Sequence, residues 1–299
     1  MRKKDNQKFG TIAILGEINV GKSTLLNQLI NKDISIVTHK ANTTREKIKG
    51  ITSDGDTQIV IIDTPGLSAT NLRTSRGFLS QVWDALIEAN YLFLVVDCRK
   101  PISQCLTQFL DQLNNSTVGL PDAVLVINKI DRCTKERLLI KSKEINDSFT
   151  FRKTFMISAL RGYGVSDMRS WMLANMPQKS WTYPKSKRHD MTMQKFLNEK
   201  TRETILLRIH QEVPYNLEVD TYEIETLRDG NIKVWQSINV QNARHRAMLI
   251  GKSGHTIKAI SSASRVKIEK ALNKKVHLFL DVKLKKRKPA RMQSSEGLL

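Results

Sequence analysis

The clearest chemical signal in this sequence is near its N-terminus, where residues 16–23 are GEINVGKS. The segment matches the pattern G-x-x-x-x-G-K-[ST] and lies between a strand-like run, Thr11–Leu15, and a helical pattern that starts at Thr24. In such a loop, glycines let backbone N–H groups close around phosphate oxygens, and the following helix directs its positive end at them. A nucleoside triphosphate site is therefore predicted at Gly16, Glu17, Ile18, Asn19, Val20, Gly21, Lys22, Ser23 and Thr24.

Two side chains of this loop, together with a second segment, are expected to act on the phosphates and their metal ion. Lys22 is expected to bridge the β- and γ-phosphates, and the Ser23 hydroxyl to bind Mg²⁺. The second segment, Asp63-Thr64-Pro65-Gly66 followed by Leu67, ends another strand-like run. There we expect Asp63 to help hold the metal and the Gly66 N–H to contact the γ-phosphate.

Base recognition is assigned to two further strand ends. Asn128-Lys129-Ile130-Asp131 follows one apolar run, and Ser158-Ala159-Leu160 follows the next. The Asp131 carboxylate can accept two hydrogen bonds from the N1–H and exocyclic amine of guanine, which adenine does not present on that edge. A buried acceptor left unpaired by the wrong base makes such discrimination steep. The pattern therefore predicts GTP and GDP as ligands.

A sheet whose strands end on one side is needed to hold these motifs together. Strand-like runs alternate with helix-length segments, which is typical of a mostly parallel sheet with helices on both faces. An Asp-Gly turn at 54–55 separates Ile48–Thr52 from Gln58–Ile62, so this pair is predicted to form an antiparallel hairpin at the sheet edge. The other strands are predicted at Thr11–Leu15, Tyr91–Val96, Ala123–Ile127 and Thr154–Ile157.

The alternation stops near Met176-Pro177, and a second domain is predicted beyond a polar, basic linker. We place the first domain at residues 8–179, the linker at 180–190, the second domain at 191–284 and a basic tail at 285–299. The second domain is predicted to have the order α-β-β-α-α-β. Its elements are expected at Met191–His210, Leu217–Thr226, Ile232–Gln241, on both sides of Gly251–Gly254, and at Val276–Lys283.

Charge and composition restrict the class of protein. The net charge is +20, and residues 233–291 hold 16 lysines and arginines against Glu269 and Asp281 alone. Such a basic stripe predicts a polyanionic partner, either nucleic acid or an anionic membrane surface. No apolar run approaches the roughly 20 residues that cross a bilayer. The three cysteines form no C-x-x-C pair, so we expect neither a disulfide framework nor a zinc site, and a reducing cytoplasm as the compartment.

The ordered motifs GEINVGKS, TTR, DTPG, NKID and SAL resemble a GTPase domain of the translation-factor class. Further on, QEVPYNLEVDTYEIE and MLIGKSGHTIKAIS resemble the KH domain of the Era family, bacterial ribosome-assembly GTPases of the TrmE-Era-EngA-like superfamily. The resemblance covers nearly the whole chain. It implies an α/β P-loop GTPase domain followed by an α+β type II KH domain, with slow, Mg²⁺-dependent hydrolysis of GTP. It also implies binding to single-stranded RNA, not DNA, at the 3′ end of 16S rRNA, and a role in 30S subunit assembly and rRNA maturation.

Within this resemblance, two elements bear on hydrolysis. Thr43 and Thr44 resemble the switch I threonines; Thr44 is favoured as the residue that reaches Mg²⁺ and the γ-phosphate, and Thr43 is the alternative. Leu67 stands where Ras-like GTPases have the glutamine that orients the attacking water. Asn19 either helps to bind a potassium ion beside the phosphates, as in related GTPases, or caps a turn. The residues assigned to catalysis are Asn19, Lys22, Thr44 and Gly66.

The RNA site is predicted around Gly251–Gly254, a G-x-x-G loop between two helical patterns. In KH domains this loop holds the backbone of about four nucleotides of a single strand. RNA contacts are assigned to Arg244, Arg246, Gly251, Lys252, Ser253, Gly254 and Lys258. The cationic run at 283–288 is either a solvated tail or a further contact for RNA or anionic lipid.

Two functions remain open on the sequence alone. In the first, GTP changes how the two domains dock, so RNA binding depends on the nucleotide, and linkage requires RNA to favour the GTP form by the same factor. In the second, the chain is a constitutive RNA-binding or membrane-surface protein whose GTPase module regulates another process, such as cell-cycle control. We expect a cytoplasmic protein, with peripheral association at the cytoplasmic face of the inner membrane as a further prediction.

Overall fold

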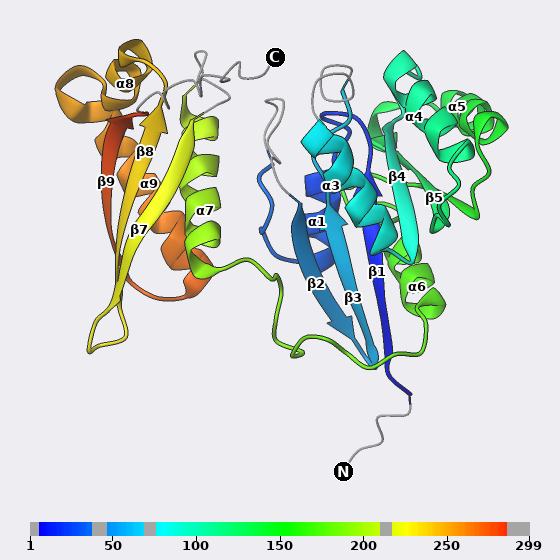
Figure 1. Ribbon diagram of the computed structural model, residues 1–299, viewed down its shortest axis with the longest axis horizontal. Coiled ribbons are helices and arrows are strands. Elements are labelled where there is room, and N and C mark those ends of the chain that lie inside the picture. Colours follow the sequence, from blue (N-terminus) through cyan, green and yellow to red (C-terminus); the bar gives the residue numbers. More distant parts are fainter. Residues whose placement is uncertain (1–5, 38–46, 69–75, 210–216, 286–299) are drawn as a thin grey trace, which may run out of the picture. The chain divides into compact units, whose positions relative to one another are not determined.

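The computed structural model describes residues 6–37, 47–68, 76–209 and 217–285, which are the coloured parts of Figure 1. Thr43, Thr44 and the tail beyond residue 285 lie outside the described residues. The chain divides into two compact units, Met1–Thr192 and Met193–Leu299. Every helix in the described part is too short or too polar to cross a bilayer.

The first unit is built on a six-stranded sheet with the strand order β2-β3-β1-β4-β5-β6 (Figure 1). All neighbouring strands are parallel except β2 and β3, which form the antiparallel hairpin predicted for the sheet edge. The predicted strands are confirmed, with ends that shift by up to three residues. The strands are β1 (Lys8–Leu15), β2 (Ile48–Asp54), β3 (Thr57–Asp63), β4 (Tyr91–Asp97), β5 (Asp122–Asn128) and β6 (Lys153–Met156).

Helices cover both faces of this sheet, because each buries an apolar stripe against it. On one face, α1 and α6 enclose a core that includes Leu25, Phe93 and Met168. On the other face, α3, α4 and α5 cover a second core that includes Phe109. The helices of this unit are α1 (Lys22–Ile30), α3 (Arg76–Ile87), α4 (Gln104–Asn114), α5 (Lys135–Ser148) and α6 (Val165–Asn175).

The segment after α6, predicted as a polar linker, is hydrogen-bonded along the first unit. The indole N–H of Trp181 donates to the carbonyl oxygens of Lys8 and Asp56 at 3.1 and 3.0 Å. The backbone of Tyr183 exchanges two hydrogen bonds with the side chain of Gln58, which is fully buried. The Ile51 N–H donates to the Arg188 carbonyl at 2.8 Å, so the segment also pairs with the outer edge of β2.

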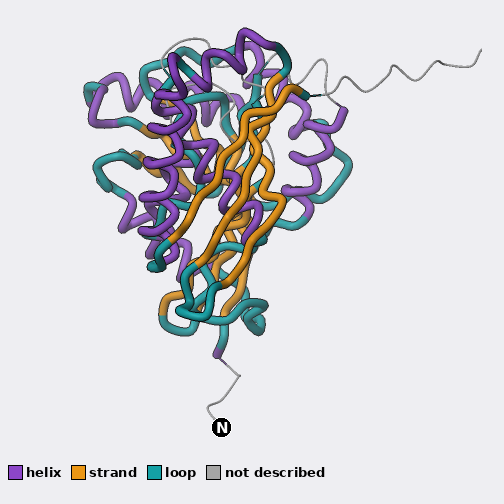
Figure 2. The backbone as a smooth tube through the Cα atoms, turned by 90° about the vertical axis from the view of Figure 1, so that its left-hand side faces the viewer, coloured by secondary structure: helices purple, strands orange, loops and turns teal. Residues whose placement is uncertain are grey.

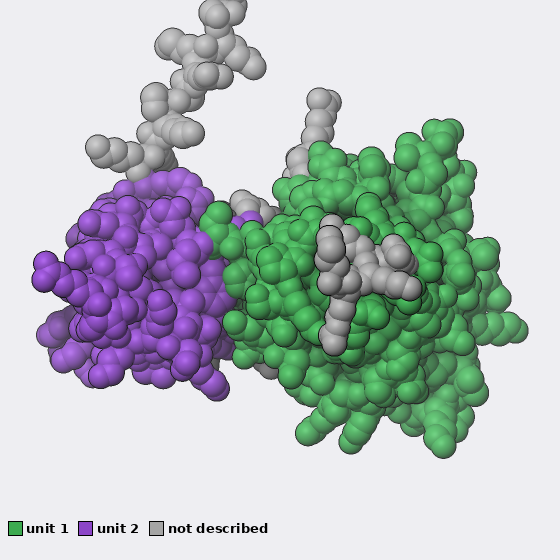
Figure 3. Space-filling model, turned by 90° about the horizontal axis from the view of Figure 1, so that it is seen from below, with its two compact units in different colours: residues 1–192 green, residues 193–299 purple. Residues whose placement is uncertain are grey.

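The second unit has the predicted order α-β-β-α-α-β. Its sheet has the order β7-β8-β9, with β7 antiparallel and β9 parallel to β8. Figure 2 draws the strands of both units in orange. Two clusters of buried side chains from the helices and the sheet form its core. Figure 3 shows the two units in different colours. The elements are α7 (Met193–Arg208), β7 (Glu218–Thr226), β8 (Ile232–Val240), α8 (Ala243–Ile250), α9 (His255–Leu272) and β9 (Val276–Leu284).

Cys98 and Cys133 are joined by a disulfide, so the expectation that the cysteines form none was wrong. The two residues are 35 positions apart in the sequence, yet their Cα atoms lie 6.5 Å apart. Cys98 directly follows β4 and Cys133 follows the short turn after β5, and these strands are neighbours. The disulfide therefore depends on β4 and β5 being neighbours in the sheet, and the spacing of cysteines in the sequence does not predict that. Cys105 is a free cysteine, and burial raises the pKa of its thiol.

Candidate nucleotide and RNA sites

Four of the predicted nucleotide motifs lie within the described residues, and each is at the carboxyl end of a parallel strand. Gly16 follows β1, Asp63 ends β3, Asn128 ends β5 and Ser158 follows β6. The pairing of Asp63 with Ile14 and of Asn128 with Asp97 puts these ends at one edge of the sheet. Segments more than a hundred residues apart in the chain therefore meet there.

The phosphate-binding loop and the base-recognition loop are in direct contact at Gly21. Its φ of 104° lies in the left-handed region, and a Cβ atom there would lie 2.3 Å from Nδ2 of Asn128. Only glycine fits this approach. The helix α1 begins at the next residue, so its N-terminal N–H groups point into the loop.

Lys22 is buried within the loop that it belongs to. Its ammonium group donates to the carbonyl oxygens of Gly16 and Glu17 at 3.0 and 2.8 Å. Burial lowers the pKa of Lys22 from 10.5 to about 8, against the opposing effect of the nearby carboxylates of Asp63 and Glu17. A polyanion bound in this loop would reverse that shift, because it would favour the charged form of the amine.

A hydroxyl and a carboxylate at the start of α1 and the end of β3 form the candidate metal site. The buried Asp63 carboxylate accepts hydrogen bonds from the hydroxyls of Ser23 at 2.8 Å and Ser35 at 2.9 Å. Hydroxyl and carboxylate oxygens are hard ligands of the kind Mg²⁺ prefers. No group of three or more histidine, cysteine, aspartate or glutamate residues is arranged for a metal within the described ranges. This donor set fits an ion that is held partly by nucleotide phosphates and water.

The segment 63–67 lies against the phosphate-binding loop through its backbone. The Leu67 N–H donates to the Gly16 carbonyl at 3.0 Å, and a Cβ atom on Gly66 would lie 2.8 Å from the Ile18 side chain. The Leu67 side chain is only 1% exposed. An apolar, buried side chain at this position has no polar atom with which to orient a water molecule.

Asn128 joins three of the predicted motifs through one side chain. Its Nδ2 donates to the Val20 carbonyl at 2.8 Å, and its Oδ1 accepts from the backbone N–H groups of Lys129 and Ala159 at 2.8 and 2.9 Å. The amide is buried and all of these contacts are short. It therefore fixes the phosphate-binding loop against both segments assigned to base recognition.

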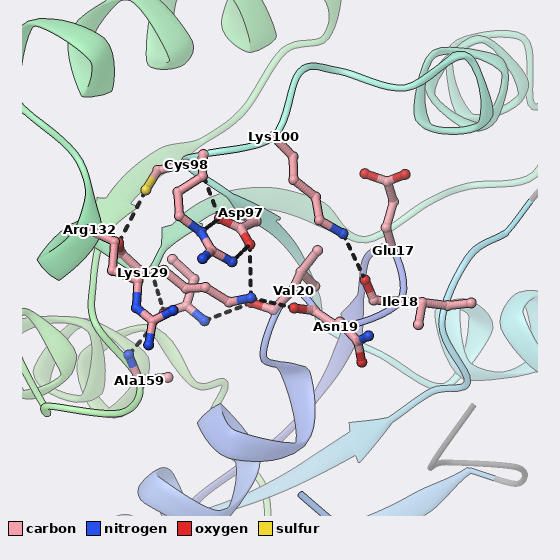
Figure 4. A network of polar contacts seen from close by, with 12 residues as sticks. Glu17, Ile18, Asn19, Val20, Asp97, Cys98, Lys100, Lys129, Arg132 and Ala159 are labelled. Atoms are coloured by element: carbon pink, nitrogen blue, oxygen red, sulfur yellow. Dashed lines mark hydrogen bonds and ion pairs between the residues drawn. The ribbon is translucent and has the colours of Figure 1, made fainter. Parts of the chain in front are cut away.

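Beside Asn128, a network of charged groups links the same loops (Figure 4). The Lys129 ammonium donates to the backbone oxygen of Asn19 and to the Asp97 carboxylate, the latter at 2.8 Å. Asp97 also accepts from Nε and Nη2 of Arg99 at 3.0 and 2.7 Å. Burial alone would raise the pKa of Asp97, but these hydrogen bonds outweigh it and hold the pKa well below its usual range.

Sequence reasoning missed Asp97 and one further polar contact of the loop. Asp97 ends β4, which lies in the chain between β3, ended by Asp63, and β5, ended by Asn128. Its place at the end of a strand on the same sheet edge was the one feature of the sequence that could have indicated it. The Glu17 carboxylate accepts a 2.6 Å hydrogen bond from the Ser103 hydroxyl, which caps α4. No local sequence pattern predicts that contact.

The remaining predicted residues of the nucleotide site vary in exposure. The Asp131 side chain is 18% exposed and lies 3.7 Å from the Arg132 guanidinium. Ser158 is buried and accepts from the Arg161 N–H, whereas Leu160 is 67% exposed. Thr24 lies in the first turn of α1.

In the second unit, the predicted RNA loop connects α8 to α9. Gly251 has a φ of 72°, and a Cβ atom there would lie 2.0 Å from the Thr256 hydroxyl, so the close turn into α9 requires glycine. Lys252 and Ser253 are exposed at the tip. Of the other residues assigned to RNA, Arg244 and Lys258 are exposed, and the Arg246 Nε donates to the Val282 carbonyl at 3.2 Å.

Two family models match separate parts of the chain. Residues 11–129 match the family described as "50S ribosome-binding GTPase", and residues 212–288 match the KH domain family. GTPase Era from Dinoroseobacter shibae is 40% identical over 278 residues, which are 93% of this chain and 90% of that protein. GTPase Era from Rhizobium meliloti is 39% identical over 93% of this chain and 88% of its own length.

Two solved structures extend the similarity to three dimensions. A crystal structure of Era in complex with MgGDPNP and nucleotides 1506–1542 of 16S ribosomal RNA has a TM-score of 0.84 and 27% identity. A variant of Aquifex aeolicus Era with one tyrosine replaced by alanine, bound to GDP and aluminium fluoride, gives the same values. Each comparison covers 94% of this chain and 95% of the other.

Proposed function

The chain belongs to the Era family of GTPases, and from this premise we propose that it couples GTP binding to RNA binding during assembly of the 30S ribosomal subunit. Hydrolysis of GTP to GDP and phosphate is the activity of this family. The RNA we propose is the 3′ end of 16S rRNA, because the similar Era crystal structure holds nucleotides 1506–1542 of that RNA.

The proposal assigns each nucleotide motif a role. Lys22 binds the β- and γ-phosphates, Ser23 and Asp63 hold Mg²⁺, and the Asp131 carboxylate pairs with guanine. The observation that carries it is the Asn128 side chain, whose contacts with Val20 and Ala159 bring the loops for phosphate and base together. Thr44 is proposed as the switch I ligand of Mg²⁺.

Hydrolysis is proposed to be slow and to depend on groups other than a glutamine. When bound, Mg²⁺ supplies positive charge that neutralises the phosphates. The Gly66 N–H is proposed to contact the γ-phosphate, and Asn19 to help hold a potassium ion. The buried Leu67 agrees with a low intrinsic rate, because it offers no polar atom to the attacking water.

RNA binding is proposed for the second unit, with its domain at residues 191–284. Lys252 and Ser253 are exposed at a loop tip between two glycines, which suits close approach to a phosphate backbone. The 16 basic residues within 233–291 supply the attraction, and the tail at 285–299 is proposed as an additional electrostatic contact.

The test is to measure GTP-analogue affinity of the full chain with and without an oligonucleotide of the 16S rRNA 3′ end. Because linkage is reciprocal, RNA should tighten binding of a non-hydrolysable GTP analogue by the same factor as the analogue tightens RNA binding. A scrambled oligonucleotide of equal length is the control. No change in either affinity would favour the constitutive RNA-binding protein instead.

We propose that the protein is cytoplasmic, where the small subunit is assembled. Peripheral association with the inner membrane is a separate proposal, supported only by the positive charge of the tail. Sedimentation with vesicles of anionic and of neutral lipid distinguishes them: binding to anionic vesicles that is lost when residues 285–299 are deleted supports the membrane proposal, and absence of binding refutes it.

A further inference from the structure

Asp97 is a buried carboxylate that none of the nucleotide motifs contains. Its side chain is 0% exposed, and it ends β4, where it pairs in register with Asn128 on β5. A buried carboxylate is costly unless it is paired, and Asp97 is paired twice, with Arg99 and with Lys129. The two partners differ in what else they contact.

Lys129 extends the pair toward the phosphate-binding loop. Its ammonium group lies between the Asp97 carboxylate and the carbonyl oxygen of Asn19 (Figure 4). Lys129 has a φ of 67°, in the left-handed region that residues other than glycine rarely adopt, and the Arg132 N–H donates to its carbonyl at 2.9 Å. The backbone and the ammonium group of Lys129 are therefore both fixed. Arg99, by contrast, donates to Asp97 and is 36% exposed.

We propose that Asp97 is a positioning residue for guanine nucleotides: it holds the Lys129 ammonium against the Asn19 carbonyl and so keeps the base-recognition loop attached to the phosphate-binding loop. Without that carboxylate, the ammonium group is free to follow the nearby phosphate charges of a bound nucleotide, because a Coulomb attraction between partly buried charges is weakly screened. The two loops then lose one of the contacts that close them around the ligand. The inference rests on the nucleotide site proposed above.

The test uses the full chain and follows release of a fluorescent GDP derivative after mixing with excess GDP. Asp97→Asn retains the shape of the side chain and removes its charge, and Lys129→Met retains the length and removes the ammonium group. We expect each to accelerate GDP release by about tenfold, equivalent to ~1.4 kcal/mol. In steady-state hydrolysis, Asp97→Asn should raise KM for GTP more than it lowers kcat, as expected for a group that acts on binding.

A double-mutant cycle separates positioning from general stability. If Asp97 acts through Lys129, the double variant should release GDP no faster than Lys129→Met alone, because the interaction is already lost. Arg99→Gln is the matched control: it removes the other ion pair of Asp97 and should change release by less than about threefold. Effects that multiply in the double variant, or an equal effect of Arg99→Gln, would overturn the inference.

Two outcomes keep this test separate from that of the proposed function. If the unmodified chain does not bind GDP, the proposed function itself fails. If the unmodified chain binds GDP and a folded Asp97→Asn variant releases it at the normal rate, only the role of Asp97 is refuted. Should Asp97→Asn fail to fold, Lys129→Met still decides, because Lys129 is partly exposed and unchanged release in that variant contradicts the bridge.

Discussion

The hydroxyl of Ser23 donates a 2.8 Å hydrogen bond to the carboxylate of Asp63, 40 residues further along the chain. The contact joins the first turn of α1 to the end of β3 and brings two hard oxygen ligands to one place. The Ser35 hydroxyl holds the same carboxylate oxygen at 2.9 Å. The position of Asp63 is thus set by two hydroxyls, of which only that of Ser23 belongs to the phosphate-binding loop.

This arrangement predicts a specific defect for Asp63→Asn. Because the substitution removes a negative charge beside a divalent ion, the Mg²⁺ concentration for half-maximal GTP hydrolysis should rise by about tenfold. The measurement is hydrolysis at saturating GTP across a Mg²⁺ titration. Ser35→Ala, which removes one hydrogen bond and leaves the charge, should shift the midpoint far less. An unchanged midpoint for Asp63→Asn would exclude this carboxylate from the metal site.

The depressed pKa of Lys22 predicts that nucleotide binding takes up protons. With a pKa near 8 in the nucleotide-free chain, Lys22 is mostly neutral at pH 8.5, and bound phosphates should restore its charge. GDP binding at pH 8.5 should therefore take up a substantial fraction of a proton, measured by titration calorimetry in buffers of different ionisation enthalpy. At pH 7 the uptake from this group should be close to zero, and equal values at both pH values would contradict the assignment.

The same pKa has a consequence for the stability of the nucleotide-free chain. Because the folded state disfavours protonated Lys22, its burial costs stability below about pH 8. The cost should decline as pH rises from about 8 toward the ordinary value of 10.5. In Lys22→Met, urea unfolding should show a smaller rise over that pH window than in the unmodified chain.

Base recognition predicts a change of specificity for Asp131→Asn. The substitution replaces an acceptor by a group that can donate to the carbonyl of xanthine, where guanine has an amine. GTP affinity should fall by about hundredfold or more, since buried polar groups would be left unpaired, while XTP affinity should rise. Competition of GTP and XTP against a fluorescent GDP derivative measures both. Equal GTP affinity in the variant and the unmodified chain would mean that residues 128–131 do not read the base.

Local sequence predicted the motifs and the strands that hold them, because both depend on residues close together in the chain. Gly21 must adopt a backbone conformation that favours glycine, and Lys22 must supply a positive charge, wherever the loop lies in the fold. The spacing of residues in the motif was therefore enough to predict both. The contacts that depend on strand order were missed. Asp97 acquires its role from the pairing of β4 with β5, and the disulfide at Cys98 and Cys133 depends on the same pairing.

The linker is a second case in which the sequence did not predict a contact between distant segments, here one made by a polar side chain. Prolines and lysines in residues 177–190 predicted a linker; most of its residues are exposed, and its backbone also pairs with the outer edge of β2. The buried Gln58 side chain helps to hold this path, because its amide nitrogen and oxygen each form a hydrogen bond with the Tyr183 backbone. A glutamine in an apolar strand carries no sign of which distant segment it will bind.

Asn19 predicts a dependence on monovalent cations. The residue has a φ of 62° in the phosphate-binding loop, and its carbonyl accepts from Lys129. If its side chain helps to hold potassium, replacing potassium by sodium should slow GTP hydrolysis and leave GTP affinity nearly unchanged. Asn19→Ala should remove the difference between the two salts. Equal hydrolysis rates of the unmodified protein in both salts would leave Asn19 with the role of a turn residue.

The loop between α8 and α9 gives the sharpest prediction for RNA. Lys252→Asp combined with Ser253→Asp should lower affinity for the single-stranded 16S oligonucleotide by about hundredfold, because two carboxylates would face phosphates at close range. Asn273→Asp with Lys274→Asp is the matched control: it makes the same change of charge at exposed residues beyond the other end of α9, and Asn273 shares the left-handed φ of 51° with Ser253.

GTP binding should be unaffected in both variants, and stability should change by less than about 0.5 kcal/mol per exposed substitution. For the unmodified chain, the logarithm of RNA affinity should fall with the logarithm of salt concentration with a slope of about −0.7 per phosphate neutralised. Equal losses in the two double variants would mean that net charge, and not this loop, binds the RNA.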